Sequence, residues 1–190
     1  MIERPQWDSR TVVCIASGPS LTDEDCELAK ASGHPVVVTN TTFQLCPWAD
    51  ALFAFDLKWW RRYHKQVERG FNGRRFTASL VAGNYGADVL LGVPWFRGFR
   101  NSGASAVSLA ISGGARRVVM LGYDAGFDGG KTHWHGDHPA DLDNASSIED
   151  WARQFEMLAK YAQRCGVEVL NASRRTRLTC FKRVNLEDVL

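Results

Sequence analysis

Short apolar runs alternate with amphipathic stretches along most of the chain. The apolar runs are rich in β-branched residues and end at polar or turn-forming residues, which is typical of buried strands. Between them, apolar residues recur every three or four positions, as they do on one face of a helix. The pattern predicts strands at residues 12–16, 36–39, 51–55, 76–81, 117–121 and 167–170, and helices at residues 23–32, 58–69, 102–112 and 148–165.

This order of elements predicts the fold class. Strands that alternate with helices form a mostly parallel sheet with helices on both faces. Because the crossovers are right-handed, we expect a single doubly wound, Rossmann-like α/β domain over residues 1–190. Residues 123–147 depart from the pattern, because they form a long stretch rich in Gly and Asp without periodicity. A loop of this length is usually functional, and we expect it to be mobile and to close over a ligand.

The first predicted strand runs into Ser17, Gly18, Pro19 and Ser20, and Thr22 is placed to cap the helix that follows. A small-residue loop between a strand and a helix offers backbone N–H groups to an anion. The loop lacks the three spaced glycines of a dinucleotide fingerprint and the Gly-Lys-Ser/Thr of a Walker loop. We therefore expect a phosphate site here, and we expect a bulky residue at Gly18 to abolish binding without unfolding the protein.

Polar residues also follow the other predicted strands. In open α/β sheets, ligands bind outside the carboxyl ends of the strands, so these residues are expected to share one rim. Turn formation alone would explain any one of them. A further helix begins near Ser102 and Gly103, where unpaired N–H groups favour a second phosphate contact, although close helix–sheet packing would also require small residues. The residues at the strand ends are Asn40, Asp56, Asp124 and Asn171.

Residues 132–138 read THWHGDH. The string matches the zinc motif of the metallo-β-lactamase superfamily, in which His133, His135, Asp137 and His138 would be ligands. However, residues 127–131 are turn-like where that motif follows a strand, and no histidine follows His138. We therefore expect no metal here, and we interpret the cluster as a general base or phosphate contact on the loop.

Composition adds few constraints. Hydrophobic residues make up 45% and charged residues 23% of the 190, and the net charge of +2 argues neither for nor against a polyanionic partner. Five scattered cysteines without a Cys-x-x-Cys pair indicate reduced thiols in a cytoplasmic protein. No apolar run is long enough to cross a membrane.

Residues 58–65 predict an amphipathic helix with a basic face or, alternatively, an aromatic platform for a base or sugar. A second basic group comprises Arg174, Arg175, Arg177, Lys182 and Arg183.

In order along the chain, SGPSL, TN, ALFAFDLKWW, NSGASAVSLAISGGARRVVMLGYD, the histidine loop and VEVLNAS resemble one superfamily. It includes the Campylobacter-type bacterial sialyltransferases and the archaeal hydroxymethylpterin diphosphokinases. Small phage-encoded proteins look still closer in length and in the THWHGDHP loop. The resemblance extends from Val12 to about Leu190 and is specific to the fold and the nucleotide site, not to the reaction.

The resemblance implies roles for individual residues. Nucleotide contacts would fall to the first loop, to Asn40 and Asp56, and to Ser102 and Gly103. A histidine in the loop before the last helix would be the base, with His138 preferred and His135 also eligible. The phosphate-binding tyrosine of the sialyltransferases is absent, since Ala125 and Gly126 occupy that stretch.

The sequence therefore predicts a cytoplasmic, nucleotide-dependent transferase, most like a glycosyltransferase with a nucleotide-activated sugar donor. Its catalytic residues would be His138 or His135, with Asp124. One alternative is Mg²⁺-dependent pyrophosphoryl transfer from ATP, with Asp56, Asp124 and Asp128 as metal ligands. The other is a phage accessory protein that only binds a nucleotide. The acceptor stays open among sugars, small molecules and modified nucleic-acid bases, as does assembly into a homo-oligomer.

Overall fold

A computed structural model describes residues 4–8, 10–91, 101–127, 129–136, 142 and 148–190. Strands alternate with helices along the chain, as the hydrophobic pattern predicts. The strands are β1 (Thr11–Ile15), β2 (Val36–Thr39), β3 (Ala51–Phe53), β4 (Arg74–Thr77), β5 (Asp88–Val89), β6 (Arg117–Leu121), β7 (Glu168–Asn171) and β8 (Lys182–Arg183). The α-helices are α1 (Asp23–Ala31), α2 (Leu57–Gly70), α3 (Ser102–Ser112) and α4 (Ile148–Arg164), and the 3₁₀ helices are η1 (Asn40–Gln44), η2 (Ala82–Tyr85) and η3 (Leu186–Asp188).

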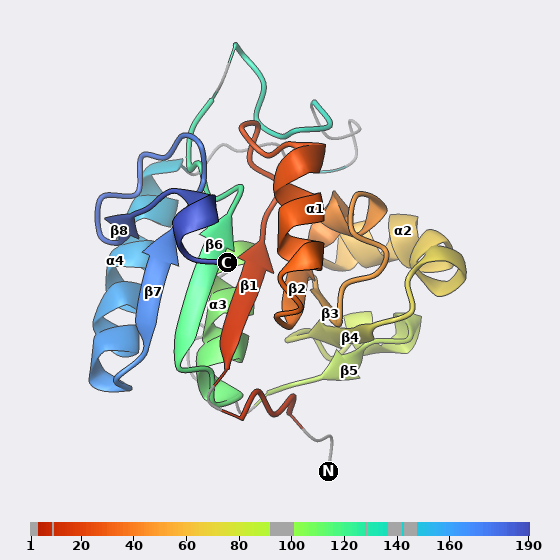
Figure 1. Ribbon diagram of the computed structural model, residues 1–190. Helices are drawn as coiled ribbons and strands as arrows, with labels where there is room; N and C mark the ends of the chain where they lie inside the picture. The colour runs from red at the N-terminus through yellow and green to blue at the C-terminus, as the bar shows by residue number, and fades with distance from the viewer. Residues whose placement is uncertain (1–3, 9, 92–100, 128, 137–141, 143–147) are drawn as a thin grey trace.

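All eight strands form one sheet in the order β5-β4-β3-β2-β1-β6-β7-β8, and every pair is parallel. The predicted Rossmann-like α/β class is confirmed. The chain adds β2 to β5 on one side of β1 and then crosses to β6 on the other side (Figure 1). Ile15 is paired with Leu121 and with Val38, so β1, β2 and β6 end at the same rim. This reversal beside β1 creates the crevice in which α/β proteins bind ligands.

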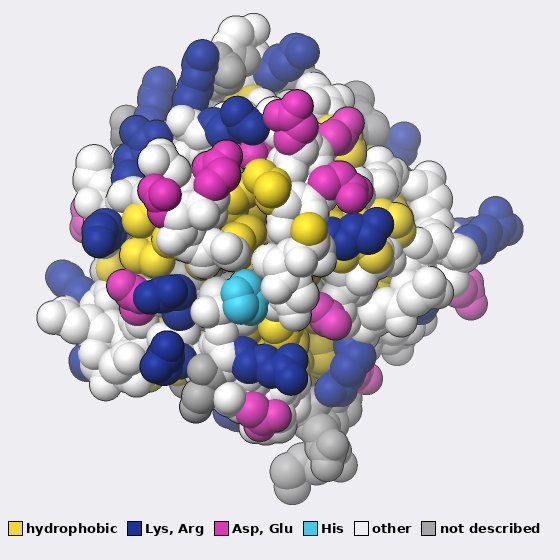
Figure 2. All heavy atoms as spheres, viewed as in Figure 1, with side chains coloured by type: hydrophobic (Ala, Val, Ile, Leu, Met, Phe, Trp, Pro, Cys, Tyr) yellow, Lys and Arg dark blue, Asp and Glu magenta, His cyan; other side chains and the backbone are white. Residues whose placement is uncertain are grey.

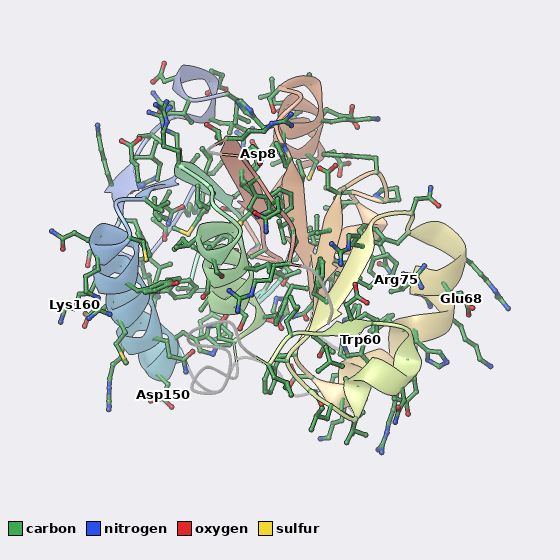
Figure 3. All side chains as sticks on the ribbon, turned by 90° about the horizontal axis from the view of Figure 1, so that it is seen from below. Asp8, Trp60, Glu68, Arg75, Asp150 and Lys160 are labelled. Carbon is green, nitrogen blue, oxygen red and sulfur yellow. The ribbon has the colours of Figure 1, made fainter. Side chains whose placement is uncertain are left out.

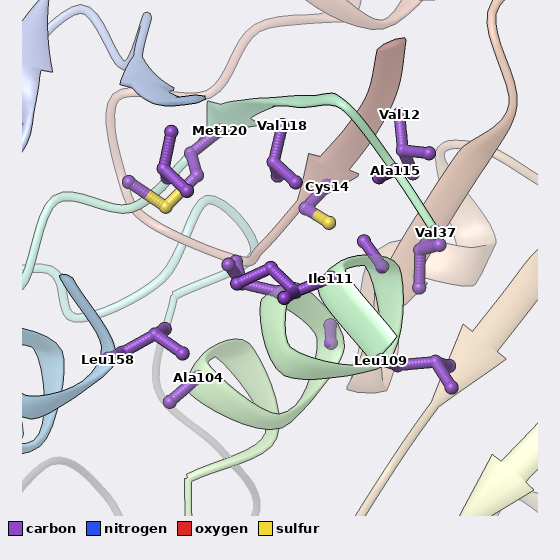
Figure 4. Close-up of a cluster of buried hydrophobic side chains, with 14 of the residues drawn as sticks. Val12, Cys14, Val37, Ala104, Leu109, Ile111, Ala115, Val118, Met120 and Leu158 are labelled. Carbon is purple, nitrogen blue, oxygen red and sulfur yellow. The ribbon is translucent and has the colours of Figure 1, made fainter. Parts of the chain in front are cut away.

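Helices cover both faces of the sheet, each over its own core. On one face, Leu109 and Ile111 of α3 and Leu158 of α4 pack against Cys14 and Met120 (Figure 4). The opposite core, which includes α1 and α2, contains side chains that alternate with these along each strand, such as Val13 and Ile15 of β1. The alternation follows from the two-residue period of a strand.

Helix α2 is amphipathic, as the pattern of residues 58–65 predicts. Trp59, Trp60 and Tyr63 are buried, whereas Arg61 and Lys65 are exposed. Trp60 lies between α2 and the sheet, and its indole N–H donates to the carbonyl of Ala54 at 3.0 Å (Figure 3). Packing of the aromatic face therefore explains most of this stretch.

Some strand boundaries differ from the predicted ones. The strand predicted at residues 76–81 is β4 and ends at Thr77, because Ser79 N–H donates to Thr77 Oγ1 and Ser79 Oγ accepts from Ala82 N–H, which turns the chain into η2. Leu80 is consequently exposed. The strands β5 and β8 are two residues long and were not predicted, because periodicity cannot be recognised over two residues.

No helix in the described part of the chain is long and apolar enough to cross a membrane. The five cysteines are free thiols: Cys14, Cys26 and Cys46 are buried, Cys180 is half-buried and Cys165 is exposed. Burial raises the pKa of the Cys14 thiol well above its ordinary value. These buried thiols belong to the two cores.

Candidate functional site

A cavity of about 510 Å³ lies at the carboxyl ends of β1, β2, β3 and β6, and we call it the central cavity. Its volume is within the range of small-molecule sites. The loops that follow β1 and β6 lie side by side at its rim (Figure 1). Of the residues predicted from the sequence, the cavity brings together Ser17, Gly18, Pro19, Asn40, Asp56, Ser102, Gly103 and Asp124.

The loop after β1 does not offer the row of open amides that its sequence predicts. Gly18 N–H donates to Gly122 O at 2.8 Å, and Leu21 N–H donates to Gly18 O at 3.1 Å. Ser20 N–H donates to Asp124 Oδ2 at 2.7 Å. For these three amides the prediction is wrong, because the loop uses them to hold its own shape and the neighbouring loop. Ser20 is buried and is not part of the cavity wall.

Asp124 is the residue that connects the two loops. It is 4% exposed, and its Oδ1 accepts from Ser20 Oγ at 2.8 Å while Oδ2 accepts from the Ser20 amide. Its carbonyl accepts from Arg177 N–H at 2.8 Å, and Ser20 Oγ accepts from Arg175 N–H at 3.3 Å. Asp124 thus joins three segments around the cavity. Both oxygens of the predicted catalytic carboxylate therefore act in positioning the loops.

Gly18 is required by packing within the protein. A Cβ at this position would lie 2.5 Å from Asp124 Oδ1 and would also overlap the carbonyl oxygen of Gly122. A bulky side chain here would displace the Asp124 connection itself. The expectation that such a substitution leaves the fold intact is therefore wrong, and other variants are needed to test the site.

The first turn of α3 faces the cavity with Ser102 and Gly103. Asn101 caps the helix by accepting from Ala104 N–H at 3.1 Å, and Ser102 Oγ accepts from Phe55 N–H at 3.1 Å. The second bond draws the end of β3 toward α3. The backbone amides of Ser102 and Gly103 donate to no acceptor among the described residues. This helix start is the feature of the cavity best suited to an anion.

Two residues of the cavity wall have left-handed backbone conformations that are uncommon outside glycine. Asn40 has φ +48° directly after β2, and Ala125 has φ +47° shortly after β6. Such conformations persist where the surrounding structure imposes them, and they cluster at binding and catalytic sites. At both places the left-handed residue lies shortly after the end of a strand, in the wall of the cavity.

The histidine segment, residues 132–136, is fastened to the loop after β1. Trp134 N–H donates to Ser17 O at 3.1 Å, and Ser17 Oγ lies 3.0 Å from His133 Nδ1. His133 lines the cavity, while His135 stacks on His133 with ring centroids 5.1 Å apart and does not line it. The preferred base, His138, lies outside the described residues, as does Asp137. The predicted mobile loop, residues 123–147, also includes residues outside the described part of the chain, so its movement stays a prediction.

The described residues do not gather the carboxylates that a Mg²⁺-dependent kinase requires. Asp56 lines the cavity, Asp124 accepts from Ser20 with both oxygens, and Asp128 lies outside the described part of the chain. Among the described residues, no group of three or more His, Cys, Asp and Glu side chains is placed to hold a metal ion.

The basic group near the C-terminus does not face the cavity. Arg174 binds Asp25 with its Nε at 3.0 Å, and this hydrogen bond with the aspartate charge raises the pKa of Arg174. Lysine and arginine side chains are distributed over the face shown in Figure 2, with acidic side chains among them. Of the lysines and arginines that the structure describes, Lys58 lines the central cavity. A smaller hollow of about 300 Å³, at the amino ends of the strands, includes Lys30 and Trp48.

No family model matches the chain. No curated protein sequence matches it. Among solved structures, the chain is similar to a UDP-glucose 4-epimerase from Brucella ovis in complex with NAD, at 13% identity and a TM-score of 0.36. The similarity covers 86% of this chain and 51% of the epimerase, so the chain spans about half of that enzyme's length. At this level of similarity, the epimerase carries no information on what the chain binds.

Several residues of the cavity wall were missed by sequence reasoning. His133 was predicted as a member of the histidine cluster, but His138 and His135 were named as the base in its place. Trp151 and Phe155 of α4 had no such signal, because an aromatic residue on an amphipathic helix is normally part of the core.

Proposed function

We propose that this protein is a transferase that binds a nucleotide-activated sugar in the central cavity and passes the sugar to an acceptor hydroxyl. The observation that carries the proposal is the position of this cavity at the crevice beside β1, with the first turn of α3 and Lys58 in its wall. Helix N-terminal amides and a lysine suit the phosphates of such a donor.

In this proposal His133 is the general base. When Nδ1 carries the ring proton and donates it to Ser17 Oγ, Nε2 becomes the basic atom. Nε2 takes the proton of the acceptor hydroxyl while its oxygen forms a bond to the anomeric carbon. The bond from that carbon to the phosphate oxygen breaks, and the nucleoside phosphate leaves with the electron pair. The amides of α3 and Lys58 stabilise the charge that develops on the leaving phosphate.

A thermal-shift series tests the proposal. Unfolding is followed with CMP, UDP, GDP, ADP and ATP and with the corresponding nucleotide-sugars, each with and without Mg²⁺. We expect at least one nucleotide and its sugar derivative to raise the melting temperature, by roughly 5–10 °C at a hundredfold excess over Kd. No shift with any of them would contradict nucleotide binding. A shift confined to ATP with Mg²⁺ would favour pyrophosphoryl transfer.

Two lysines of α2 provide matched variants for this series. Lys58 lines the cavity, whereas Lys65 is on the exposed face of the same helix. Lys58→Ala should weaken nucleotide binding by about tenfold, because it removes a positive charge beside the phosphates. Lys65→Ala should leave the melting shift unchanged. Equal effects of the two variants would place the ligand outside the central cavity.

A further inference from the structure

The wall of the central cavity carries different side chains on the two sides of β1. One end, which we call the aromatic end, is formed by Tyr123, Trp151, Phe155 and Leu178. Tyr123 and Phe155 meet edge to face with centroids 5.8 Å apart, and Trp151 precedes Phe155 by one turn of α4. Trp151 is only half-buried, so part of this indole ring is available to a ligand.

The other end, which we call the polar end, is formed by Asn40 and Asp56, with Leu57 and Trp59 beside them in the wall. Asp56 is exposed and Trp59 is buried, whereas Lys58 is assigned to the phosphates. The Asn40 side-chain oxygen is buried and has no hydrogen-bond partner among the described residues. Buried acceptors are normally satisfied, so this oxygen is suited to a hydroxyl donor of a ligand.

The sheet order keeps the two ends apart. Residues of the polar end follow β2 and β3, on one side of β1, whereas those of the aromatic end follow β6 or β7 or belong to α4, on the other side. The first turn of α3 touches both sides. Ser102 Oγ accepts from Phe55 N–H just after β3, and a Cβ at Gly103 would lie 3.1 Å from the Tyr123 ring. A phosphate at this turn would therefore have the polar end on one side and the aromatic end on the other.

We infer that the donor lies in the cavity with its nucleobase at the aromatic end and its sugar at the polar end. This inference rests on the proposed function and names the orientation of the ligand in that same site. A base presents a flat π face, which stacks on aromatic side chains. A sugar presents hydroxyls, which pair with carboxylate and amide oxygens. The orientation is the reverse of the one implied by the sialyltransferase resemblance, in which Asn40 and Asp56 contact the nucleotide.

This orientation of the donor places the bond that breaks near the proposed base, His133. The bond that breaks joins the sugar to the phosphate, so it lies between the polar end and the first turn of α3. Ser17 follows β1, the strand between the two sides, and holds His133 at 3.0 Å. The base His133 is thus near the middle of the cavity, where the sugar and the phosphate join, and the acceptor approaches from the sugar side.

Calorimetry on three ligands tests the orientation. The ligands are the nucleoside monophosphate selected by thermal shift, its nucleotide-sugar, and ribose 5-phosphate, which lacks a base. Trp151→Ala should lower the affinity for the monophosphate by roughly tenfold or more without changing the affinity for ribose 5-phosphate. Trp151→Phe, which keeps an aromatic face, should weaken it by less. Asp56→Asn should lower the affinity for the nucleotide-sugar but not the affinity for the monophosphate.

The opposite pattern overturns the inference. If Asp56→Asn lowers the affinity for the monophosphate and Trp151→Ala does not, the base lies at the polar end. An unchanged monophosphate affinity in both Trp151 variants also overturns it, while nucleotide binding itself still supports the proposed function. If the wild-type protein binds none of the nucleotides, the proposed function fails, and the orientation fails with it.

A second measurement does not depend on the stability of the alanine variant. The wild-type protein is labelled with 5-fluorotryptophan, and Trp151→Phe identifies the ¹⁹F resonance of Trp151. We expect the nucleoside monophosphate to shift this resonance and ribose 5-phosphate to leave it unchanged. Equal shifts with both ligands would contradict contact between the base and Trp151.

Discussion

His133→Ala is expected to lower the rate of sugar transfer by a hundredfold to ten-thousandfold, with little change in nucleotide affinity. A general base contributes about this much to a rate, and it acts on the acceptor proton, not on the bound nucleotide. Loss of transition-state stabilisation without loss of ground-state binding would appear as a lower kcat at an unchanged Kd. Turnover is measured with the donor identified by thermal shift, and Kd is measured by calorimetry on the same preparation.

His135→Ala is the matched control, since His135 lies behind His133 and does not line the cavity. It should retain most of the activity. Ser17→Ala should give an intermediate loss, because Ser17 Oγ orients the His133 ring but takes no proton from the acceptor. Full activity in His133→Ala, or a larger loss in His135→Ala, would contradict the assignment of the base.

Asp124→Ala is expected to lower the free energy of unfolding by about 2–4 kcal/mol. The substitution leaves the buried Ser20 N–H and hydroxyl without their acceptor, and hydrogen bonds to a charged group are among the stronger ones. For a chain of this size, the melting temperature should fall by roughly 5–15 °C. Because the two loops at the cavity rim separate, nucleotide affinity should fall as well.

Asp56→Ala is the control for Asp124→Ala, since Asp56 also lines the cavity but is exposed. Its melting temperature should stay within about 2 °C of the wild-type value, as is usual for surface substitutions. Denaturant unfolding of both variants provides the comparison. A stable Asp124→Ala protein with normal nucleotide affinity would contradict the role of Asp124 in positioning the loops.

The hydrophobic pattern was sufficient to predict the layered architecture. Strands such as β2 and β6 are apolar except for Thr39 and Arg117 at their ends, because a central parallel strand is buried on both faces. The N-terminus of α1 was equally clear, since Thr22 and Asp25 form the reciprocal capping box that their spacing allows. These features depend on residues close together in the sequence.

Features that depend on distant residues could not be predicted in the same way. Asp124 was recognised as a polar residue at a strand end, but its bonds to Ser20 join positions 104 residues apart. The spacing within residues 132–138 did not indicate that His133 lines the cavity. That outcome depends on two bonds to Ser17, which is in another loop.

The first loop shows why a local motif can mislead. Its small residues do indicate that another group lies very close to the loop. For Gly18, however, that group is the backbone of Gly122 and not a ligand. A glycine allows close approach of any group, so its presence alone does not distinguish a phosphate from a neighbouring strand end. The same ambiguity applied to Gly103, which the structure places in the cavity wall.

Mapping of amide chemical shifts during a nucleotide titration shows whether the nucleotide binds in the central cavity. In a ¹⁵N-labelled sample, we expect the nucleotide selected by thermal shift to move the resonances of Ser17, Ser102, Gly103 and Tyr123, which line the central cavity. Residues at the amino ends of the strands, such as Lys30 and Trp48 in the smaller hollow, should not move. Shifts confined to that hollow, or no shifts at saturating nucleotide, would contradict a nucleotide site in the central cavity.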